Sequence, residues 1–299
     1  MKHWREHLQA APDAETTAWR LFNGKGFRWG GIWIDNFDGH WLVQTTKDKF
    51  PEPFREAVES GEARSIYWKH REKVVKGTPQ WIAGEVVKEP FPITENGITY
   101  LIDFDSGYSQ GIFLDQRENR RRLMDRVQPG ERILNCFAYT CAFSVAAAKV
   151  GGITSSLDLS SPYLDWGKLN LENNGIDPKS QYFCKGDVFE WLATFHRQER
   201  RFRGVILDPP TFSRNQKGKI FKADKDYADL VALACGVLEE DAWILCTGNT
   251  HHLDNRSFEM TVRDGVRRGR RIVSEMETFP MPPEYGEEDY LKTAWVTVA

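Results

Sequence analysis

Five short apolar stretches, each followed by a stretch with helical periodicity, occupy the second half of the chain and constrain its fold more than any other feature. The strand-like runs begin at about Arg132 and are RILNCF, ITSSLDL, SQYFCK, FRGVILD and AWILCT. Five consecutive strand–helix pairs predict a parallel sheet with right-handed crossovers and helices on both faces, which is an α/β Rossmann-like fold. Two later apolar runs, RIVSEMETF and YLKTAWVTVA, predict two more strands, including an antiparallel edge.

The first part of the chain has a different composition. Seven of the eleven tryptophans lie in the first 100 residues, among β-like runs such as GGIWID and HWLVQT. We therefore expect a small α+β domain over residues 1–105, with a possible role in substrate recognition, and the sheet domain over residues 106–299. Exposed aromatic side chains can stack on nucleic-acid bases, but in so small a unit most of them must form its core.

Charge gives only weak guidance about partners. The net charge of −3 provides no overall attraction to nucleic acid. Three basic clusters start at Arg117, His196 and Arg263. They would bind phosphates if the fold brought them together, although a single cluster of this kind is more often a solvated helix face.

Cysteine and hydropathy patterns exclude several classes of protein. The five cysteines are scattered without a C-x-x-C pair, which argues against a disulfide framework or a zinc site. The chain has no apolar run long enough to span a membrane and no apolar leader at its N-terminus. We expect a cytoplasmic protein without a metal site.

Polar side chains follow the ends of four successive predicted strands. The first strand reaches Asn135 and the second ends at Asp158, while Asp187 and Asp208 follow the third and fourth. A carboxylate at a strand end is often only a helix cap. Polar side chains at the ends of four successive strands are harder to explain as caps. Ligands of such sheets bind beyond the carboxyl ends of the strands, so these four side chains predict a binding site.

The loop after the first strand narrows the choice of cofactor. Residues 136–143 contain no glycine, whereas the pyrophosphate of a dinucleotide needs a G-x-G-x-x-G loop. A nucleoside cofactor without phosphates fits better, and S-adenosylmethionine (SAM) is the common one. Asp158 would bind the ribose hydroxyls, Asp187 with Val188 the adenine, and the Asp208 region the sulfonium end. A dehydrogenase is the less favoured alternative.

The segment Asp208-Pro209-Pro210-Thr211-Phe212 is the most specific motif. Two successive prolines fix the backbone and remove donors, so the Asp and the Pro carbonyls are held rigidly at the edge of the sheet, with Phe212 available to stack on a planar substrate. The alternative is a rigid turn with Phe212 in the core. The position directly after a buried strand favours a substrate pocket.

From about Trp19 to the C-terminus, the chain resembles the bacterial 23S ribosomal RNA methyltransferases of the RlmI (cytosine C5) and RlmK (guanine N7) type. Matching stretches are RLFNGKG, GIFLDQRENRR, LNCFAYTCAFS, SLDLSSPYLDWGKLNLENNG, LDPPTFS and YLKTAWV. The resemblance implies a class I methyltransferase fold, SAM as methyl donor and RNA as partner. It implies SAM contacts at Gln110, Phe113, Asp115, Arg117, Asn135, Phe137, Ala138, Tyr139, Thr140, Asp158, Ser160, Asp187, Val188 and Asp208.

The chain departs from these relatives at three places. Too few residues precede Trp19 for the N-terminal PUA domain of the cytosine-type enzymes. Relatives carry glycine where this chain has Cys141, so we expect a tighter or shifted loop around the methionine moiety. The cytosine-type relatives place a nucleophilic cysteine after the fifth strand, where this chain has Asn249, as in the RlmK-like relatives. Cys246 lies inside the apolar strand and is expected in the core.

The departure at Asn249 bears on the reaction. Methylation of cytosine C5 requires a thiolate that adds to C6, so this reaction is disfavoured. A ring nitrogen such as guanine N7 already has a lone pair, and catalysis is then mainly alignment and exclusion of water. Asp208, the Pro209 carbonyl and Asn249 would bind the base edge while Phe212 stacks on its face. The catalytic set is therefore expected to be Asp208, Pro209, Pro210, Phe212 and Asn249.

Several weaker signals leave alternatives open. Asn215, Lys217 and Lys219 are candidates for contacts with flanking phosphates, or they belong to an ordinary basic loop. Adjacent histidines such as His251 and His252 point in different directions, so we do not expect them to bind a metal. A methyltransferase of a protein or small molecule, or a non-catalytic module that binds SAM or RNA, remains the alternative function. The sequence leaves the oligomeric state open.

Overall fold

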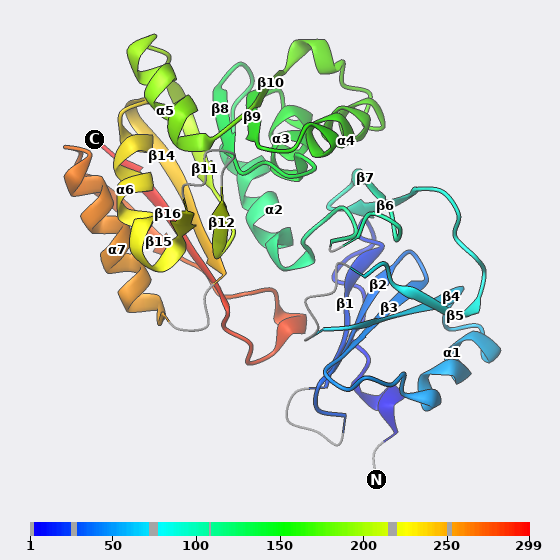
Figure 1. Ribbon diagram of the computed structural model, residues 1–299. Helices are drawn as coiled ribbons and strands as arrows, with labels where there is room; N and C mark the ends of the chain where they lie inside the picture. Colours follow the sequence, from blue (N-terminus) through cyan, green and yellow to red (C-terminus); the bar gives the residue numbers. More distant parts are fainter. Residues whose placement is uncertain (1–2, 25–28, 72–76, 108, 215–219, 250–252) are drawn as a thin grey trace. The chain divides into compact units, whose positions relative to one another are not determined.

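The computed structural model describes residues 3–24, 29–71, 77–107, 109–214, 220–249 and 253–299 (Figure 1). The chain divides into two compact units. The first consists of residues 1–117 and 282–287, and the second of residues 118–281 and 288–299. The first unit thus extends past residue 105 and includes a segment from near the C-terminus.

The first unit is built around a five-stranded sheet. Its strands follow the order β1-β2-β3-β4-β5, in which β3 and β4 are parallel and the other neighbours antiparallel, and β6 and β7 form a separate hairpin. The elements of this unit are η1 (Trp4–His7), β1 (Ala18–Asn23), β2 (Ile32–Phe37), β3 (His40–Thr45), η2 (Glu52–Arg55), α1 (Glu56–Glu59), β4 (Ser65–His70), β5 (Gln80–Gly84), β6 (Phe91–Glu95), β7 (Ile98–Ile102), η3 (Leu114–Gln116) and η5 (Pro283–Tyr285).

Aromatic side chains form the core of the first unit. Trp4 is buried, with its ring edge-on to that of Trp41 and close to that of Phe54. Phe22 packs edge-on against Phe54 in the same cluster. These rings therefore fill the core, as expected for most aromatics of so small a unit. Trp81, on the edge strand β5, differs from these rings, with 49% of its surface exposed.

The second unit contains the seven-stranded sheet and its helices. Its elements are α2 (Arg117–Arg126), β8 (Arg132–Cys136), α3 (Ala142–Lys149), β9 (Ile153–Asp158), α4 (Ser161–Glu172), η4 (Pro178–Ser180), β10 (Tyr182–Lys185), α5 (Val188–Arg197), β11 (Phe202–Leu207), β12 (Phe212–Arg214), β13 (Ile220–Lys222), α6 (Ala223–Cys235), β14 (Leu238–Asn249), α7 (Asn255–Arg268), β15 (Val273–Thr278) and β16 (Leu291–Val298). All five predicted strand–helix pairs are present.

The sheet follows the order β10-β9-β8-β11-β14-β16-β15, with its first five strands parallel. β16 is antiparallel to both neighbours. The edge strand β15 pairs antiparallel with β16, so the expected antiparallel edge is confirmed. The burial of the two last strands explains their order: β16 is buried along almost its whole length and lies inside the sheet, whereas the largely exposed β15 forms the edge.

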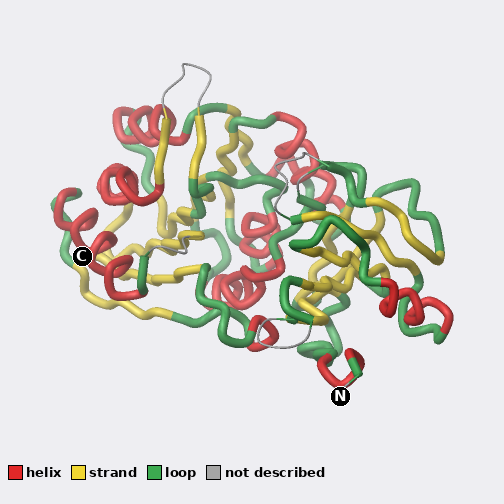
Figure 2. The backbone as a smooth tube through the Cα atoms, turned by 60° about the horizontal axis from the view of Figure 1, so that its bottom comes forward, coloured by secondary structure: helices red, strands yellow, loops and turns green. Residues whose placement is uncertain are grey.

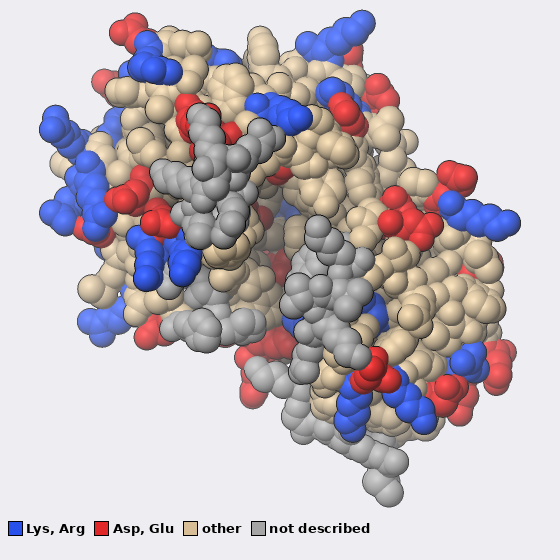
Figure 3. Space-filling view, viewed as in Figure 1, with Lys and Arg blue, Asp and Glu red and all other residues tan. Residues whose placement is uncertain are grey.

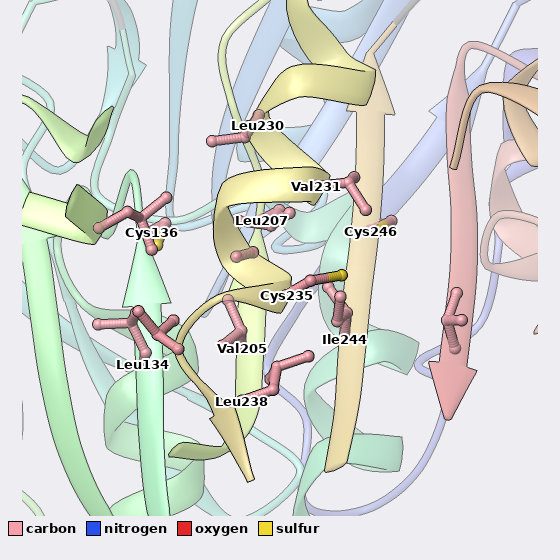
Figure 4. Packing of buried hydrophobic residues seen from close by; sticks show 14 of the residues in the cluster. Leu134, Cys136, Val205, Leu207, Leu230, Val231, Cys235, Leu238, Ile244 and Cys246 are labelled. Atoms are coloured by element: carbon pink, nitrogen blue, oxygen red, sulfur yellow. The ribbon is translucent and has the colours of Figure 1, made fainter. Parts of the chain in front are cut away.

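Helices cover both faces of this sheet, as predicted (Figure 2). One face carries α5, α6 and α7, whose apolar side chains share a core with β8, β11 and β14. Cys235 of α6 points toward Ile244 of β14 (Figure 4), and Leu230 and Val231 of α6 belong to the same buried cluster. The other three helices, α2, α3 and α4, lie on the opposite face (Figure 1).

Two arginines in the last turn of α7 pair with acidic side chains. Lys and Arg side chains gather on the side of the second unit that carries α7, with Asp and Glu among them (Figure 3). Arg267 pairs with Asp264 at 2.6 Å, and Arg268 pairs with Asp229 at 2.7 Å. This cluster therefore behaves as a solvated helix face. Within the described ranges, none of the helices combines the length and apolar character of a membrane span.

Candidate functional site

The strand register of the second unit aligns the predicted site residues along one edge of the sheet. Lys185 of β10 pairs with Asp158 of β9, and Leu157 pairs with Cys136 of β8. Leu207 of β11 pairs with Cys136 on one side and with Cys246 of β14 on the other. The segments that follow these residues therefore begin at the same carboxyl edge, where ligands of parallel sheets bind.

The loop between β8 and α3 has an unusual backbone. Phe137, Tyr139 and Cys141 have φ angles of 61°, 48° and 62°, in the left-handed region that favours glycine. The amide of Ala138 donates to the Leu157 carbonyl at 2.8 Å, which ties the loop to β9. We call residues 137–141 the β8–α3 loop. Its left-handed residues turn successive peptide groups toward the sheet edge without any glycine.

The Asp158 carboxylate connects this loop to the start of α4. Its Oδ2 accepts the Tyr139 amide at 2.9 Å, and its Oδ1 accepts the Ser160 amide at 2.8 Å. Burial raises the pKa of Asp158, and the backbone hydrogen bonds oppose this rise. Each carboxylate oxygen has a second lone pair, so Asp158 can still accept hydrogen bonds from ribose hydroxyls.

Asn135 lies behind the loop in a buried polar chain. Its Nδ2 donates to Ser144 Oγ at 2.9 Å, which lies 2.8 Å from Ser156 Oγ. Its Oδ1 makes no hydrogen bond within the described parts of the chain. This chain joins β8, α3 and β9 directly beneath the β8–α3 loop.

Asp187 acts as the N-cap of α5. Its Oδ1 accepts the amides of Phe189 at 2.9 Å and Glu190 at 3.2 Å. This is the cap role that a strand-end carboxylate often has, and it leaves the predicted adenine contact to the second oxygen. Val188, the first residue of α5, is buried beside it.

Asp208 is held by a threonine of the neighbouring strand. The Thr247 hydroxyl donates to Asp208 Oδ1. The buried Tyr227 hydroxyl lies 2.8 Å from the Thr247 carbonyl and 3.2 Å from the Leu207 carbonyl, and thus braces both strands. The half-buried Asp208 carboxylate is therefore fixed in orientation at the end of β11.

The Pro-Pro turn continues into a two-stranded hairpin. Pro209 is buried and Pro210 exposed, and β12 pairs with β13 directly afterwards. Phe212 is 54% exposed, which excludes the alternative that it belongs to the core. The Thr211 hydroxyl donates to the Asn249 carbonyl at 2.7 Å, so the turn is tied to the end of β14. Asn249 is exposed at that end.

Cys246 belongs to the core, as expected. It is fully buried on β14, beneath α6 (Figure 4). Burial raises the pKa of its thiol far above the ordinary value, so a thiolate is strongly disfavoured.

The predicted contacts before Arg117 lie in the first unit. The buried Gln110 donates through Nε2 to the Gly107 carbonyl at 3.2 Å. Phe113 is exposed and precedes η3, which contains Asp115. Arg117 is buried and forms an ion pair with Glu284. Asn215, Lys217, Lys219, His251 and His252 lie outside the described residues.

Two further groups, absent from the predicted set, support the site. Asn170 of α4 donates to the Thr140 carbonyl at 3.0 Å, and Thr247 orients Asp208. The position of Thr247 could have been predicted, because it lies two residues before Asn249 and side chains two apart share a face of a strand. The role of Asn170 could not have been predicted from the sequence, because its contact depends on how α4 packs against the loop.

This edge of the sheet suits SAM. Two carboxylates, Asp158 and Asp208, lie at the ends of parallel strands, next to a glycine-free loop that lacks the phosphate-binding pattern of dinucleotide sites. The β8–α3 loop, Asp158 and Asp208 are therefore placed where the predicted contacts with the nucleoside and sulfonium parts require them.

Comparison with known proteins also indicates a SAM-binding protein. Residues 20–289 match the family described as S-adenosylmethionine-dependent methyltransferase. Ribosomal RNA large subunit methyltransferase K of Neisseria meningitidis serogroup B is 34% identical, over 85% of this chain and 71% of its own length. Ribosomal RNA large subunit methyltransferase I of Salmonella arizonae is 30% identical, over 97% of this chain and 75% of its own length.

A solved structure supports the same conclusion. The crystal structure of SMU.776 complexed with S-adenosylhomocysteine (SAH) superposes with a TM-score of 0.82 at 29% identity, covering 95% of this chain and 76% of that one. The chain belongs to the S-adenosylmethionine-dependent methyltransferase family and is a SAM-dependent methyltransferase related to the RlmI and RlmK enzymes.

Proposed function

We propose that this enzyme methylates a ring nitrogen of a base in 23S ribosomal RNA, in the manner of the RlmK-type guanine N7 enzymes. The observation that carries the proposal is the end of β14. There the exposed residue is Asn249, at the position where the resemblance places the nucleophilic cysteine of the cytosine-type enzymes. The reaction would take place in the cytoplasm, where ribosomal RNA is modified.

Cys246 does not supply the missing nucleophile. It is three residues before Asn249, fully buried, and its pKa is raised by burial. A thiol in this position neither reaches a base at the edge of the sheet nor ionises readily, whereas carbon methylation needs a thiolate. A ring nitrogen attacks with its own lone pair and needs no thiolate.

The remaining groups suit the binding and alignment of a base. SAM, when bound, supplies an electrophilic methyl group on its sulfonium. Thr247 fixes the Asp208 carboxylate, which can accept a hydrogen bond from an exocyclic amine of the base. The exposed ring of Phe212 can stack on a base taken out of its helix. The hydrogen bond from Thr211 to the Asn249 carbonyl ties the turn to β14 and keeps Asp208 and Phe212 near Asn249.

The RNA substrate is supported by the relatives. Both curated relatives compared above carry the name ribosomal RNA large subunit methyltransferase, and they cover most of this chain. The D-P-P turn lies within residues 20–289, which match the methyltransferase family.

The proposal is tested by methyl transfer in vitro. The purified protein is incubated with 23S ribosomal RNA and SAM labelled in its methyl group, and the digested nucleosides are separated. We expect label in a nitrogen-methylated guanosine and none in 5-methylcytidine. Asp208→Ala should lower the rate by about 100-fold or more, because an oriented polar contact to the base is lost, with little change in thermal unfolding. Cys246→Ser should stay within about threefold of the wild type.

Two results would contradict the proposal. Label in 5-methylcytidine, together with an inactive Cys246→Ser variant that still binds SAH, would show carbon methylation. Binding of SAH without label in any ribosomal RNA would exclude an RNA substrate and leave a protein or small-molecule substrate, or a non-catalytic role.

A further inference from the structure

Cys141 closes the β8–α3 loop in a backbone conformation that side chains rarely adopt. Its φ is 62°, it stands at the N-cap of α3, and its side chain makes no capping hydrogen bond. The thiol is fully buried and packs with Ala138 and Leu164. Cys141 therefore keeps an unfavourable backbone conformation while its side chain points into the protein, against α4.

The space for this side chain is provided by a glycine in α4. Gly167 is buried in the middle of the helix, where glycine is unfavourable. A Cβ atom at this position would lie 2.4 Å from Cys141 Sγ and 2.7 Å from Cys141 Cβ. Rotation of the thiol can relieve the first contact. It cannot relieve the second, because the backbone fixes the Cβ of Cys141.

Without the Cys141 side chain, a Cβ at Gly167 would have no unusually short contact. The next nearest atom to a Cβ at Gly167 is the Thr140 carbonyl oxygen at 3.4 Å, which is an ordinary van der Waals contact. The need for glycine at position 167 therefore comes from the side chain at position 141. The two residues fit each other as a pair.

The same face of α4 supports the rest of the loop. Asn170, one turn after Gly167, is buried and donates to the Thr140 carbonyl at 3.0 Å. The neighbouring amide of Tyr139 is bound to Asp158 at 2.9 Å. A shift of the loop away from α4 would break these contacts and remove one of the two amides that orient the Asp158 carboxylate. The distance between α4 and the loop thus controls groups that would hold SAM.

We propose that Cys141 and Gly167 form a matched pair that sets the β8–α3 loop on α4, and that Gly167 is a positioning residue for SAM binding. Where the resemblance leads us to expect glycine at position 141, this chain has a cysteine, and the absence of a Cβ at Gly167 leaves room for its side chain. The loop then keeps its contacts with Asp158 and Asn170.

The test is calorimetric titration with SAH, which requires no knowledge of the RNA target. Gly167→Ala should weaken SAH binding by about tenfold or more, because the Cβ contact pushes the loop away. The double variant Cys141→Gly/Gly167→Ala should recover to within about threefold of the wild type. The matched double variant Cys141→Ala/Gly167→Ala should not recover, because it keeps the Cβ that causes the 2.7 Å contact.

A second glycine separates positioning from general destabilisation. Gly265 of α7 is also buried in a helix, and a Cβ there would lie 2.6 Å from Val231 Cβ. Gly265→Ala should lower the unfolding midpoint but leave SAH affinity within about twofold, and Cys141→Gly should not rescue it.

Three results would overturn the proposal: wild-type SAH affinity in Gly167→Ala, equal recovery in both double variants, or recovery in neither. If Gly167→Ala does not fold, the two double variants alone decide. The proposal is supported if the folded Gly167→Ala protein binds SAH when position 141 is glycine but not when it is alanine.

Discussion

At the scale of single residues, Asp158 has structural contacts that bear on its proposed role in binding SAM. Its oxygens accept the amides of Tyr139 and Ser160, and burial raises its pKa above the ordinary value of 3.8. Because folding raises this pKa, the contribution of Asp158 to stability is fully present below pH 3.8 and is lost as the pH rises through its folded pKa. Binding of ribose hydroxyls has the opposite requirement, since only the carboxylate accepts on all its lone pairs.

We therefore predict that SAH affinity falls as the pH is lowered from 7 through the folded pKa of Asp158. Asp158→Asn should bind SAH weakly with little pH dependence over the same range, because an amide does not titrate. Titration calorimetry at several pH values measures both, and thermal unfolding at each pH shows whether the protein is folded. A wild-type affinity that does not change with pH while the fold persists would contradict the assigned role.

The sequence predicted which residues stand at the strand ends, but not how each side chain is used. Asp158 and Asp208 lie where the alternation of strands and helices places them. The contact of Thr247 with Asp208 depends on the register of β11 against β14, and one oxygen of Asp187 is used as a helix cap. These contacts join side chains whose relative positions are fixed only by tertiary packing.

At the scale of secondary structure, β11 is the central strand that carries Asp208. Gly204 lies within it, and a Cβ there would lie 2.1 Å from Cζ2 of Trp243 on β14. The Trp243 ring is buried against Trp295, with ring centroids 5.2 Å apart, so it has little room to move. A glycine in a strand interior here reflects the close approach of a large ring.

We predict that Gly204→Ala lowers the free energy of unfolding by about 1–3 kcal/mol, because it overfills a packed core. Urea unfolding followed by circular dichroism measures this loss. The double variant Gly204→Ala/Trp243→Phe should recover part of it, since phenylalanine lacks the outer ring atoms. An alanine variant as stable as the wild type would show that the tryptophan can move aside.

Most elements of the sheet domain were predictable, because apolar runs and helical periodicity are local properties. The positions of the last two strands were not. β16 reads LKTAWVTV and is buried, and β15 reads VSEMET and is largely exposed. This difference favours β16 as the inner strand, but the order of strands depends on pairing between distant segments rather than on either pattern alone.

At the scale of the whole molecule, the chain returns to the first unit just before its last strand. Residues 282–287 belong to the first unit, where Glu284 pairs with the buried Arg117. Tyr285 accepts a hydrogen bond at its carbonyl from Asn23 at 2.8 Å, and its ring lies beneath the Arg20 guanidinium. Local sequence patterns gave no sign of this return, because its contacts join residues more than 160 positions apart.

We predict that Glu284→Ala destabilises the first unit by about 3 kcal/mol, since it leaves the buried Arg117 without its carboxylate. Tryptophan fluorescence during urea unfolding reports mainly on this unit, which contains seven of the eleven tryptophans. The double variant Arg117→Met/Glu284→Leu should lose less, because no charge is left buried. Glu287→Ala, in the same segment but exposed, is the matched control. Equal losses in Glu284→Ala and Glu287→Ala would refute this role.

The proposed activity is tested most directly by mass spectrometry of the nucleosides of 23S ribosomal RNA. Cells that lack this protein are compared with the same cells carrying either the wild type or Asp208→Ala. One nitrogen-methylated guanosine should be lost without the protein and restored only by the wild type. An unchanged modification profile, or loss of 5-methylcytidine instead, would contradict nitrogen methylation of ribosomal RNA by this enzyme.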